Sequence, residues 1–273
     1  MSNIAILRDT LVALLEEHQS DGALPTNARF LYYELVQRQC VSKQKTGVRR
    51  PDQNLHDALV DIREDGRTPW NWIVDETREL EDYTGCQTVK EGVLAQLRHI
   101  NLDPWRGSAP LILTESRSLA GTLRGIAQEY RVRIASTNGQ VGGFLRTDIV
   151  PILSPGDTVG YLGDFDWSGH LIENNTRRVL EQEIGGDLDW TRIALTEEQV
   201  RIYDLPRIVN HDRRYKDHRP HEAVETEALR QTVLTQILRD WLASLLPEPL
   251  ERVQEREQRQ RRRIERLLDE LVA

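Results

Sequence analysis

The chain has 273 residues, of which 38% are hydrophobic and 29% charged, a composition typical of a soluble globular protein with one large domain or two smaller ones. Its 36 Lys and Arg residues against 44 Asp and Glu residues give a net charge of -8. That balance argues against binding nucleic acid through bulk charge alone, although it leaves room for local basic patches. No segment resembles a signal peptide or a membrane span, so we expect a cytoplasmic protein without membrane contact. The two cysteines, Cys40 and Cys86, show no CxxC or Cys/His spacing, which indicates neither a disulfide framework nor a structural zinc site.

Three helices are predicted in the first 66 residues. Apolar residues at helical spacing predict a first helix over residues 3–18, a second that opens at Pro25 and ends near Cys40, and a third that stops at Gly66. Residues 68–75 are expected to form a short extended or wing-like element. Three short helices and a wing indicate a winged helix-turn-helix over residues 1–80, with a generic helical bundle as the alternative.

A basic stretch connects the second and third predicted helices. No acidic residue occurs between positions 38 and 50, and five residues in this interval are basic: Arg38, Lys43, Lys45, Arg49 and Arg50. A basic cluster between the helices of such a unit favours contact with double-stranded DNA.

The second half of the chain alternates strands with helices. After residues 81–108, interpreted as a linker with one short helix, strands are predicted over residues 110–114, 132–135 and 159–162. Helices are predicted over residues 119–130 and 171–183, and a glycine-rich segment, residues 137–145, follows the second strand. This alternation predicts an α/β domain with a mainly parallel sheet over residues 109–246.

Three carboxylates fall at the predicted ends of two of these strands. Glu115 ends the first strand, and Asp164 and Asp166 follow the third in the stretch YLGDFDWSG. Side chains at i and i+2 share one side of a strand, and parallel strands end at the same edge, so these groups can converge. Carboxylates forced together repel unless a cation neutralises them, and oxygen ligands suit Mg2+, or Mn2+ in its place. The alternative is a polar turn in which Asp166 or Ser168 caps the following helix.

The C-terminal residues are less informative. Residues 193–199 are expected to form a loop beside the site, and residues 211–221 a solvated or phosphate-facing loop. Glu225 and Glu227 open a helix predicted over residues 223–246; either could approach the metal as an outer ligand, although acids at a helix start more often interact with the helix dipole. Residues 247–273 are predicted to form a charged helix that is exposed or binds a partner.

Together these motifs resemble the toprim (Rossmann-like) domain of topoisomerases, primases and related nucleases: a glutamate ends the first strand, a glycine-bearing turn follows the second, and DxD with a glycine follows the third. The segment RFLYY, residues 29–33, is similar to the arginine-x-x-tyrosine/phenylalanine-tyrosine motif of the topoisomerase VI A subunit and the meiotic double-strand-break transesterase. In that family a winged helix precedes the toprim domain. The resemblance covers roughly residues 25–230 and extends to orphan A-subunit-like proteins of plasmids and phages and to the toprim subunit of Wadjet plasmid defence.

The resemblance implies Mg2+-dependent cleavage of double-stranded DNA by tyrosine transesterification, with a 5'-phosphotyrosyl product. Tyr33 would be the nucleophile, with Arg29 beside it in the motif. Glu115 would be an acid/base or a metal ligand, and Asp164 and Asp166 metal ligands. Because the tyrosine in this family acts beside the partner subunit's toprim site, a homodimer is implied, and an ATPase partner subunit is compatible with it.

Two departures leave other functions open. The family commonly has a lysine directly after the strand-ending glutamate, whereas here Ser116 and then Arg117 follow, so Arg117 would supply the phosphate contact. An aromatic pair at positions 32 and 33 is also typical of core packing. A toprim nuclease that hydrolyses DNA with metal-activated water is therefore one alternative, and a non-catalytic DNA-binding or assembly protein is another.

Overall fold

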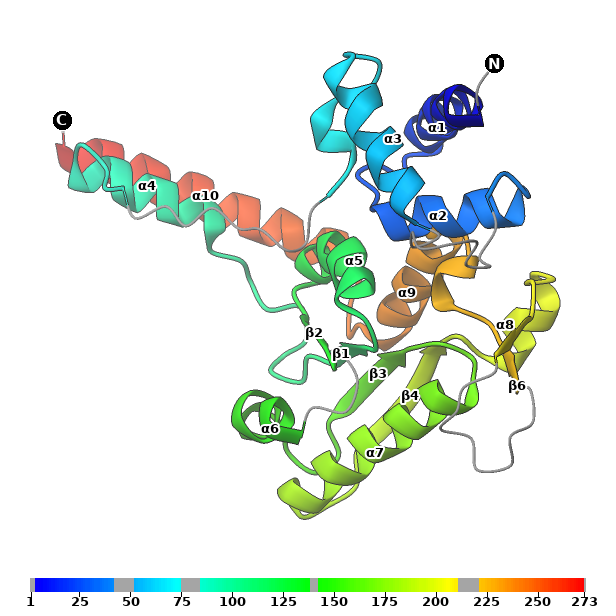
Figure 1. Ribbon diagram of the computed structural model, residues 1–273. Helices are drawn as coiled ribbons and strands as arrows, with labels where there is room; N and C mark the ends of the chain where they lie inside the picture. The colour runs from blue at the N-terminus through cyan, green and yellow to red at the C-terminus, as the bar shows by residue number, and fades with distance from the viewer. Residues whose placement is uncertain (1–2, 42–51, 75–83, 138–141, 211–220, 273) are drawn as a thin grey trace.

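A four-stranded parallel sheet organises the C-terminal part of the molecule (Figure 1). The computed structural model describes residues 3–41, 52–74, 84–137, 142–210 and 221–272. The strands follow the order β2-β1-β3-β4, and their bounds are Leu111–Thr114 for β1, Arg133–Ser136 for β2, Thr158–Leu162 for β3 and Asp189–Ala194 for β4. Each neighbouring pair is parallel. The predicted α/β class with a mainly parallel sheet is confirmed.

Helices cover both faces of this sheet because the strands are apolar on both sides. Ile112 packs in the core formed with α5 (Arg117–Tyr130) and α9 (Gln231–Leu245). Leu111 and Leu113, its neighbours in β1, pack in a second core with α7 (Trp167–Ile184) and with residues 144–153. Figure 1 shows α5 and α9 on one side of the sheet and α7 on the other. Because side chains alternate along β1, helices bury both faces of the sheet. Polar side chains can then gather where the strands end.

Several short elements accompany the parallel sheet. Residues 142–144 (α6) are followed by a five-residue turn of π-helix, Leu145–Ile149 (η2), and a 3-10 turn, Val150–Ile152 (η3). Strands β5 (Ile208–Asn210) and β6 (His221–Ala223) pair antiparallel as a separate two-stranded sheet.

Two predictions about residues 189–246 are wrong. Residues 193–199, expected to be a loop, contain the end of β4 and the start of α8 (Glu197–Ile202), which begins with a capping box between Thr196 and Gln199. The helix predicted over residues 223–246 starts late: Ala223 ends β6, residues 226–228 form one 3-10 turn (η4, Thr226–Ala228), and α9 begins only at Gln231. Pairing of Val224 with Phe165 holds this segment extended and prevents an earlier helix.

The three predicted N-terminal helices are present as α1 (Asn3–Ser20), α2 (Ala28–Gln37) and α3 (Gln53–Glu64), packed around a common core. The segment expected to be a wing forms a 3-10 turn, η1 (Trp70–Trp72), and a single parallel bridge between Ile73 and Thr26. The described part of the chain contains no two-stranded wing, and residues 75–83 lie outside it. Four of the five predicted DNA-binding residues, Lys43, Lys45, Arg49 and Arg50, also lie outside the described residues.

Helix α2 belongs to both halves of the molecule. Leu31 and Leu35 are fully buried in the N-terminal core, whereas Phe30 is fully buried in the core beneath α5 and α9. Asn27 caps the helix and donates through Nδ2 to the Thr122 hydroxyl of α5 at 2.7 Å. At the other end, Gln37 donates through Nε2 to the carbonyl of Ala228 at 2.6 Å. Both ends of α2 are therefore fixed to the C-terminal half.

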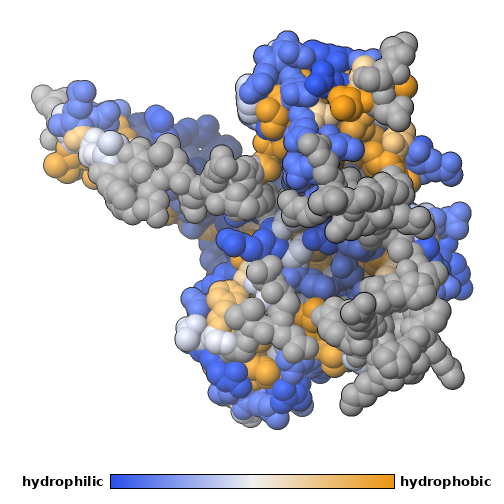
Figure 2. Space-filling view, viewed as in Figure 1, coloured by the Kyte–Doolittle hydropathy of each residue, from blue (hydrophilic) through white to orange (hydrophobic). Residues whose placement is uncertain are grey.

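An arm of two antiparallel helices projects from the body (Figure 1). It consists of α4 (Val89–His99), from the predicted linker, and α10 (Leu250–Val272), the predicted C-terminal helix. Near the free end of the arm, Lys90 of α4 pairs with Asp269 of α10 at 3.1 Å. Arg131, at the end of α5, pairs with Glu257 of α10 at 2.8 Å and so joins the arm to the body. Figure 2 shows a largely hydrophilic arm with apolar side chains toward its free end. Among the described helices, none combines the length and the apolar character needed to cross a membrane.

The close packing of β3 against α9 generates a test of the fold. A Cβ on Gly160 would lie 2.4 Å from Ile193 Cδ1 and 2.6 Å from Trp241 Cη2. We expect Gly160→Ala to lower the free energy of unfolding by about 1–3 kcal/mol, measured by urea denaturation, because the core must shift to admit the methyl group. Gly125→Ala is the control: no atom lies within 4 Å of its added Cβ in α5, and we expect a gain of about 0.5–1 kcal/mol. Equal destabilisation by both changes would contradict this packing.

Candidate metal centre

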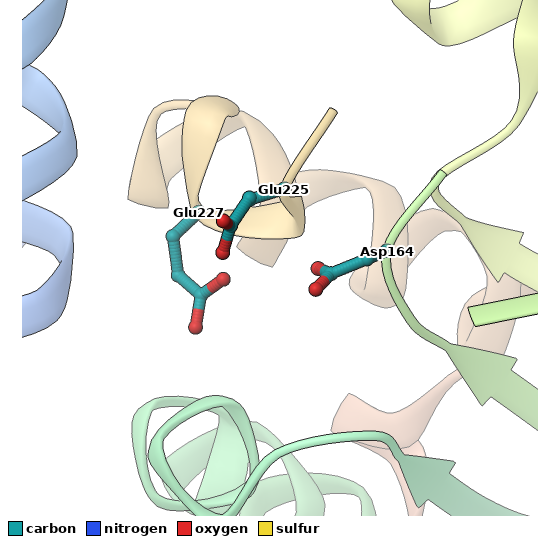
Figure 3. Close-up of side chains that lie close together, drawn as sticks. All are labelled: Asp164, Glu225 and Glu227. Carbon is teal, nitrogen blue, oxygen red and sulfur yellow. The ribbon is translucent and has the colours of Figure 1, made fainter. Parts of the chain in front are cut away.

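Three carboxylates meet at the carboxyl end of β3. Asp164, which follows β3, and Glu225 and Glu227, from the segment around η4, each place one oxygen within 4.8 Å of the others. In Figure 3 the two glutamates come from one turn, and Asp164 reaches toward them from the opposite side. We call these residues the carboxylate triad. The structure thus joins Asp164, a predicted ligand, to two residues that the sequence suggested only as outer ligands.

A pair of backbone hydrogen bonds brings the two segments together. Phe165 donates its N–H to the Val224 carbonyl at 2.8 Å, and Val224 donates to the Phe165 carbonyl at 3.0 Å. Thr226 then donates to Asp164 Oδ1 twice, from its backbone N–H at 2.8 Å and from its hydroxyl at 3.0 Å. These bonds fix the Asp164 carboxylate opposite the glutamates.

Glu227 is the most enclosed member of the triad. Its side chain is 1% exposed, and its Oε1 has no hydrogen bond of good geometry among the described residues, although Arg29 Nε lies 2.9 Å away. A buried carboxylate oxygen that lacks hydrogen bonds is costly unless a cation faces it. Arg29 is such a cation for Glu227 Oε1. The triad as a whole brings together three carboxylates, which are the oxygen ligands that suit a hard divalent ion.

The motif residues Arg29 and Tyr33 reach the triad from α2. Arg29 contacts Glu225 Oε2 through Nη2 at 2.9 Å and Glu227 Oε1 through Nε at 2.9 Å. Tyr33 is 8% exposed, and the centre of its ring lies 6.0 Å from the Arg29 guanidinium carbon. Burial, the Glu225 charge and a side-chain hydrogen bond to Glu225 raise the pKa of Tyr33 well above its ordinary value. The phenol is thus in contact with a carboxylate of its own chain.

The carboxyl groups have unusual affinities for protons. Burial raises the pKa of Glu227 to about 7 against the opposing effect of Arg29, with Asp164 adding to the rise. Burial and the Glu225 charge raise the pKa of Asp164, although the hydrogen bonds from Thr226 oppose that rise. Like charges in a dry site retain protons near neutral pH, and a bound cation would compete with those protons.

Glu115 lies behind the triad rather than in it. Its Oε2 accepts the backbone N–H of Asp164 at 3.0 Å, so it holds the loop that carries the predicted ligand. Gly163 and Gly169 make room: a Cβ on either would lie 2.9 Å or 3.2 Å from that same oxygen. Glu115 thus lies beside Asp164, as expected from the ends of parallel strands, but the three oxygens that lie together belong to Asp164, Glu225 and Glu227.

Asp166 caps a helix, which is the alternative to metal binding that the sequence left open. It is the N-cap of α7, and its Oδ1 accepts the backbone N–H of Gly169 at 2.6 Å. Ser116, at the position of the family's lysine, likewise caps α5 by accepting the backbone N–H of Leu119 at 3.1 Å.

Two predicted phosphate-contacting or DNA-contacting residues lie outside the triad. Arg117 is the exposed first residue of α5. Arg38 pairs with Glu17 at 2.5 Å.

A buried ion pair, which the sequence did not predict, supports the Asp164 loop. Arg192, in β4, donates through Nη2 to the carbonyls of Gly163 and Asp164 at 3.0 and 2.6 Å. The Glu173 carboxylate of α7 pairs with Arg192 and accepts the Trp190 indole N–H at 2.9 Å. No local sequence signal links these residues. Glu225 and Glu227, in contrast, share the i, i+2 spacing of Asp164 and Asp166, and an extended prediction for that segment would have placed both on one side.

Comparisons of this chain with known protein families, curated proteins and solved structures find no significant match.

The Glu115 environment predicts a pH dependence of stability. Burial and the Asp164 charge raise its pKa from 4.5 to about 7. The native state keeps a proton that the unfolded state loses above its lower pKa, so this contribution is complete at low pH and is lost as the pH rises through 7. In EDTA, the free energy of unfolding should fall between pH 5 and pH 7.5.

The matching variants isolate Glu115. Glu115→Gln stays neutral, so it should make the fall shallower, with the remainder coming from Glu227 and Asp164, and it should be more stable than wild type at pH 7.5 by on the order of 1 kcal/mol. Glu183→Gln, on the exposed face of α7, should leave the slope unchanged. The slopes are measured by urea denaturation across pH, and an unchanged slope in Glu115→Gln would show that Glu115 does not contribute to it.

Proposed function

We propose that this chain is a Mg2+-dependent enzyme that cleaves double-stranded DNA at the carboxylate triad. The observation that carries the proposal is the triad itself: three carboxylates that each place one oxygen within 4.8 Å of the others, with the almost completely buried Glu227 among them. Asp164, Glu225 and Glu227 would hold Mg2+, or Mn2+ in its place. The ion would stabilise charge on the phosphate and on the leaving 3' oxygen.

The coarse fold is compatible with this proposal. A parallel sheet that carries Asp164 at the carboxyl end of β3 suits a toprim domain, in which chemistry takes place beyond the strand ends. The three N-terminal helices would serve as the DNA-binding part, as in a winged helix. A homodimer and an ATPase partner subunit belong to the same proposal through the family resemblance.

Tyr33 is the nucleophile in the leading form of the reaction. Its hydrogen bond to Glu225 gives the phenol a base: Glu225 takes the proton as the phenol oxygen attacks phosphorus. The bond between phosphorus and the 3' oxygen breaks, and that oxygen leaves with the bonding electron pair and takes a proton from water, so the products are a 5'-phosphotyrosyl link and a 3'-hydroxyl. In the resembling family the tyrosine acts beside the partner's site, whereas here Tyr33 contacts a carboxylate of its own chain.

Hydrolysis is the second candidate, and the burial of Tyr33 favours it. The side chain is 8% exposed, and its raised pKa disfavours the phenolate that would attack DNA. A water molecule would then attack phosphorus at the same site, and the products would be a 5'-phosphate and a 3'-hydroxyl. A non-catalytic DNA-binding role remains the third possibility, which complete absence of cleavage would favour.

Covalent trapping distinguishes the two reactions. With supercoiled DNA and Mg2+, followed by denaturation with detergent, wild type should yield a protein–DNA adduct that Tyr33→Phe reduces by at least about 100-fold. Tyr32→Phe is the matched control, since Tyr32 has the same 8% exposure on the same helix, and it should keep the adduct. Free nicked or linear DNA that survives Tyr33→Phe would instead establish hydrolysis.

A second pair of variants tests the site itself. Asp164→Asn should reduce cleavage by at least about 100-fold under either reaction, because it removes charge from the triad. Asp166→Asn preserves the cap of α7 and lies outside the triad, so cleavage should stay within about 10-fold of wild type. Wild-type cleavage by Asp164→Asn would refute the proposed site, and a reversed pattern would restore Asp166 as the ligand.

A further inference from the structure

Arg29 occupies the position of a counter-ion to the triad. Its Nη2 lies 2.9 Å from Glu225 Oε2, and its Nε lies 2.9 Å from Glu227 Oε1. Two of the three carboxylates that would hold a divalent cation therefore face one guanidinium. Although burial lowers the pKa of Arg29, the charges of Glu227 and Glu225 more than offset that effect, so the group stays protonated.

A guanidinium and a divalent cation cannot both lie at these two carboxylates without strong repulsion. Both would bear positive charge within a few ångströms in a poorly solvated site, where charges are weakly screened. Glu227 is 1% exposed and has no freedom to turn toward solvent, so the adjustment falls to the arginine. Arg29 can move away from the glutamates, because its side chain is 39% exposed and has a long flexible stem.

We propose that Arg29 and the divalent cation are alternative counter-ions of Glu225 and Glu227, and that cation binding turns the Arg29 guanidinium outward to bind a DNA phosphate. The inference rests on the proposed function, since the phosphate belongs to the DNA substrate. A guanidinium suits that second role because its paired N–H groups match phosphate oxygens. In this scheme the metal site and the phosphate site form together, so DNA would be held at the site only when the cation is bound.

The competing explanation is structural. The ion pairs of Arg29, like the Gln37 hydrogen bond to Ala228, join α2 to the η4 segment. If Arg29 acted only as such a clamp, its loss would loosen the glutamates and weaken cation binding. The two explanations therefore predict opposite changes in metal affinity.

The test measures Mn2+ binding by calorimetry without DNA. Arg29→Gln removes the charge but keeps a long polar side chain, and we expect it to bind Mn2+ about 10-fold more tightly than wild type. Arg239→Gln is the control: Arg239 has a similar exposure of 37%, and its partner is Glu129 on α5, so Mn2+ affinity should not change. Equal or weaker Mn2+ binding by Arg29→Gln would overturn the inference.

DNA binding supplies the second readout. With Mn2+ saturating, Arg29→Gln should bind duplex DNA more weakly, and its salt dependence should be shallower by about one phosphate contact. Tighter Mn2+ binding with unchanged DNA affinity would refute the outward, phosphate-binding position. Tighter Mn2+ binding in a protein that never cleaves DNA would refute the proposed function but not the exchange of counter-ions.

A measurement on the wild-type protein guards against a variant that does not fold. Arginine Nε–Hε NMR signals can be followed during Mg2+ titration, with Arg29→Lys to assign the Arg29 signal. The ion-paired Arg29 signal should move toward the position of a solvated arginine as Mg2+ binds. Arginine signals that all stay unchanged at saturating Mg2+ would overturn the inference.

Discussion

Repulsion among Asp164, Glu225 and Glu227 is the force that the surrounding residues must offset. Three carboxylates within 4.8 Å are unstable in a dry interior unless donors or cations face them. Thr226 donates twice to Asp164, and Arg29 contacts both glutamates. Glu115, which would add a fourth charge, accepts a backbone N–H instead, and its raised pKa lowers its average charge near neutral pH. Thr226 and Arg29 offset only part of the negative charge of the three carboxylates, and this excess of negative charge favours a divalent cation.

Residues from three separate segments hold Asp164 in its place in the triad. The carbonyl of Asp164 accepts from Arg192, its N–H donates to Glu115, and its carboxylate is fixed by Thr226. Gly169 permits the start of α7 to approach the Asp164 carbonyl, since a Cβ there would lie 2.4 Å from that oxygen. Every polar group of Asp164 is thus held from a different element, and such support is what a preorganised site requires.

The sequence predicts local features of this fold well and long-range pairings poorly. Helices α1 to α3 and strands β1 to β3 follow from apolar periodicity, and Asp164 follows from its place at a strand end. Arg29 and Tyr33 were found by motif and do lie at the site. The sequence predicts a helix start at Glu225 and Glu227, because the pairing of Val224 with Phe165, which keeps Val224 extended, joins segments far apart in the chain. Asp166 was ambiguous for a different reason: an aspartate after a strand satisfies a metal and a helix cap equally well. Strand β4 was missed because half-exposed polar residues interrupt its apolar run.

Helix α2 links the two halves of the molecule in one further respect. Its Phe30 fills one core and its Leu31 and Leu35 fill another, while Asn27 and Gln37 bond both of its ends to the C-terminal half. Unfolding either half would expose apolar surface of a helix that the other half needs. The described halves should therefore melt as one cooperative unit, and the carboxylate site cannot be separated from the N-terminal helices without losing Arg29, Tyr33 and a part of its own core.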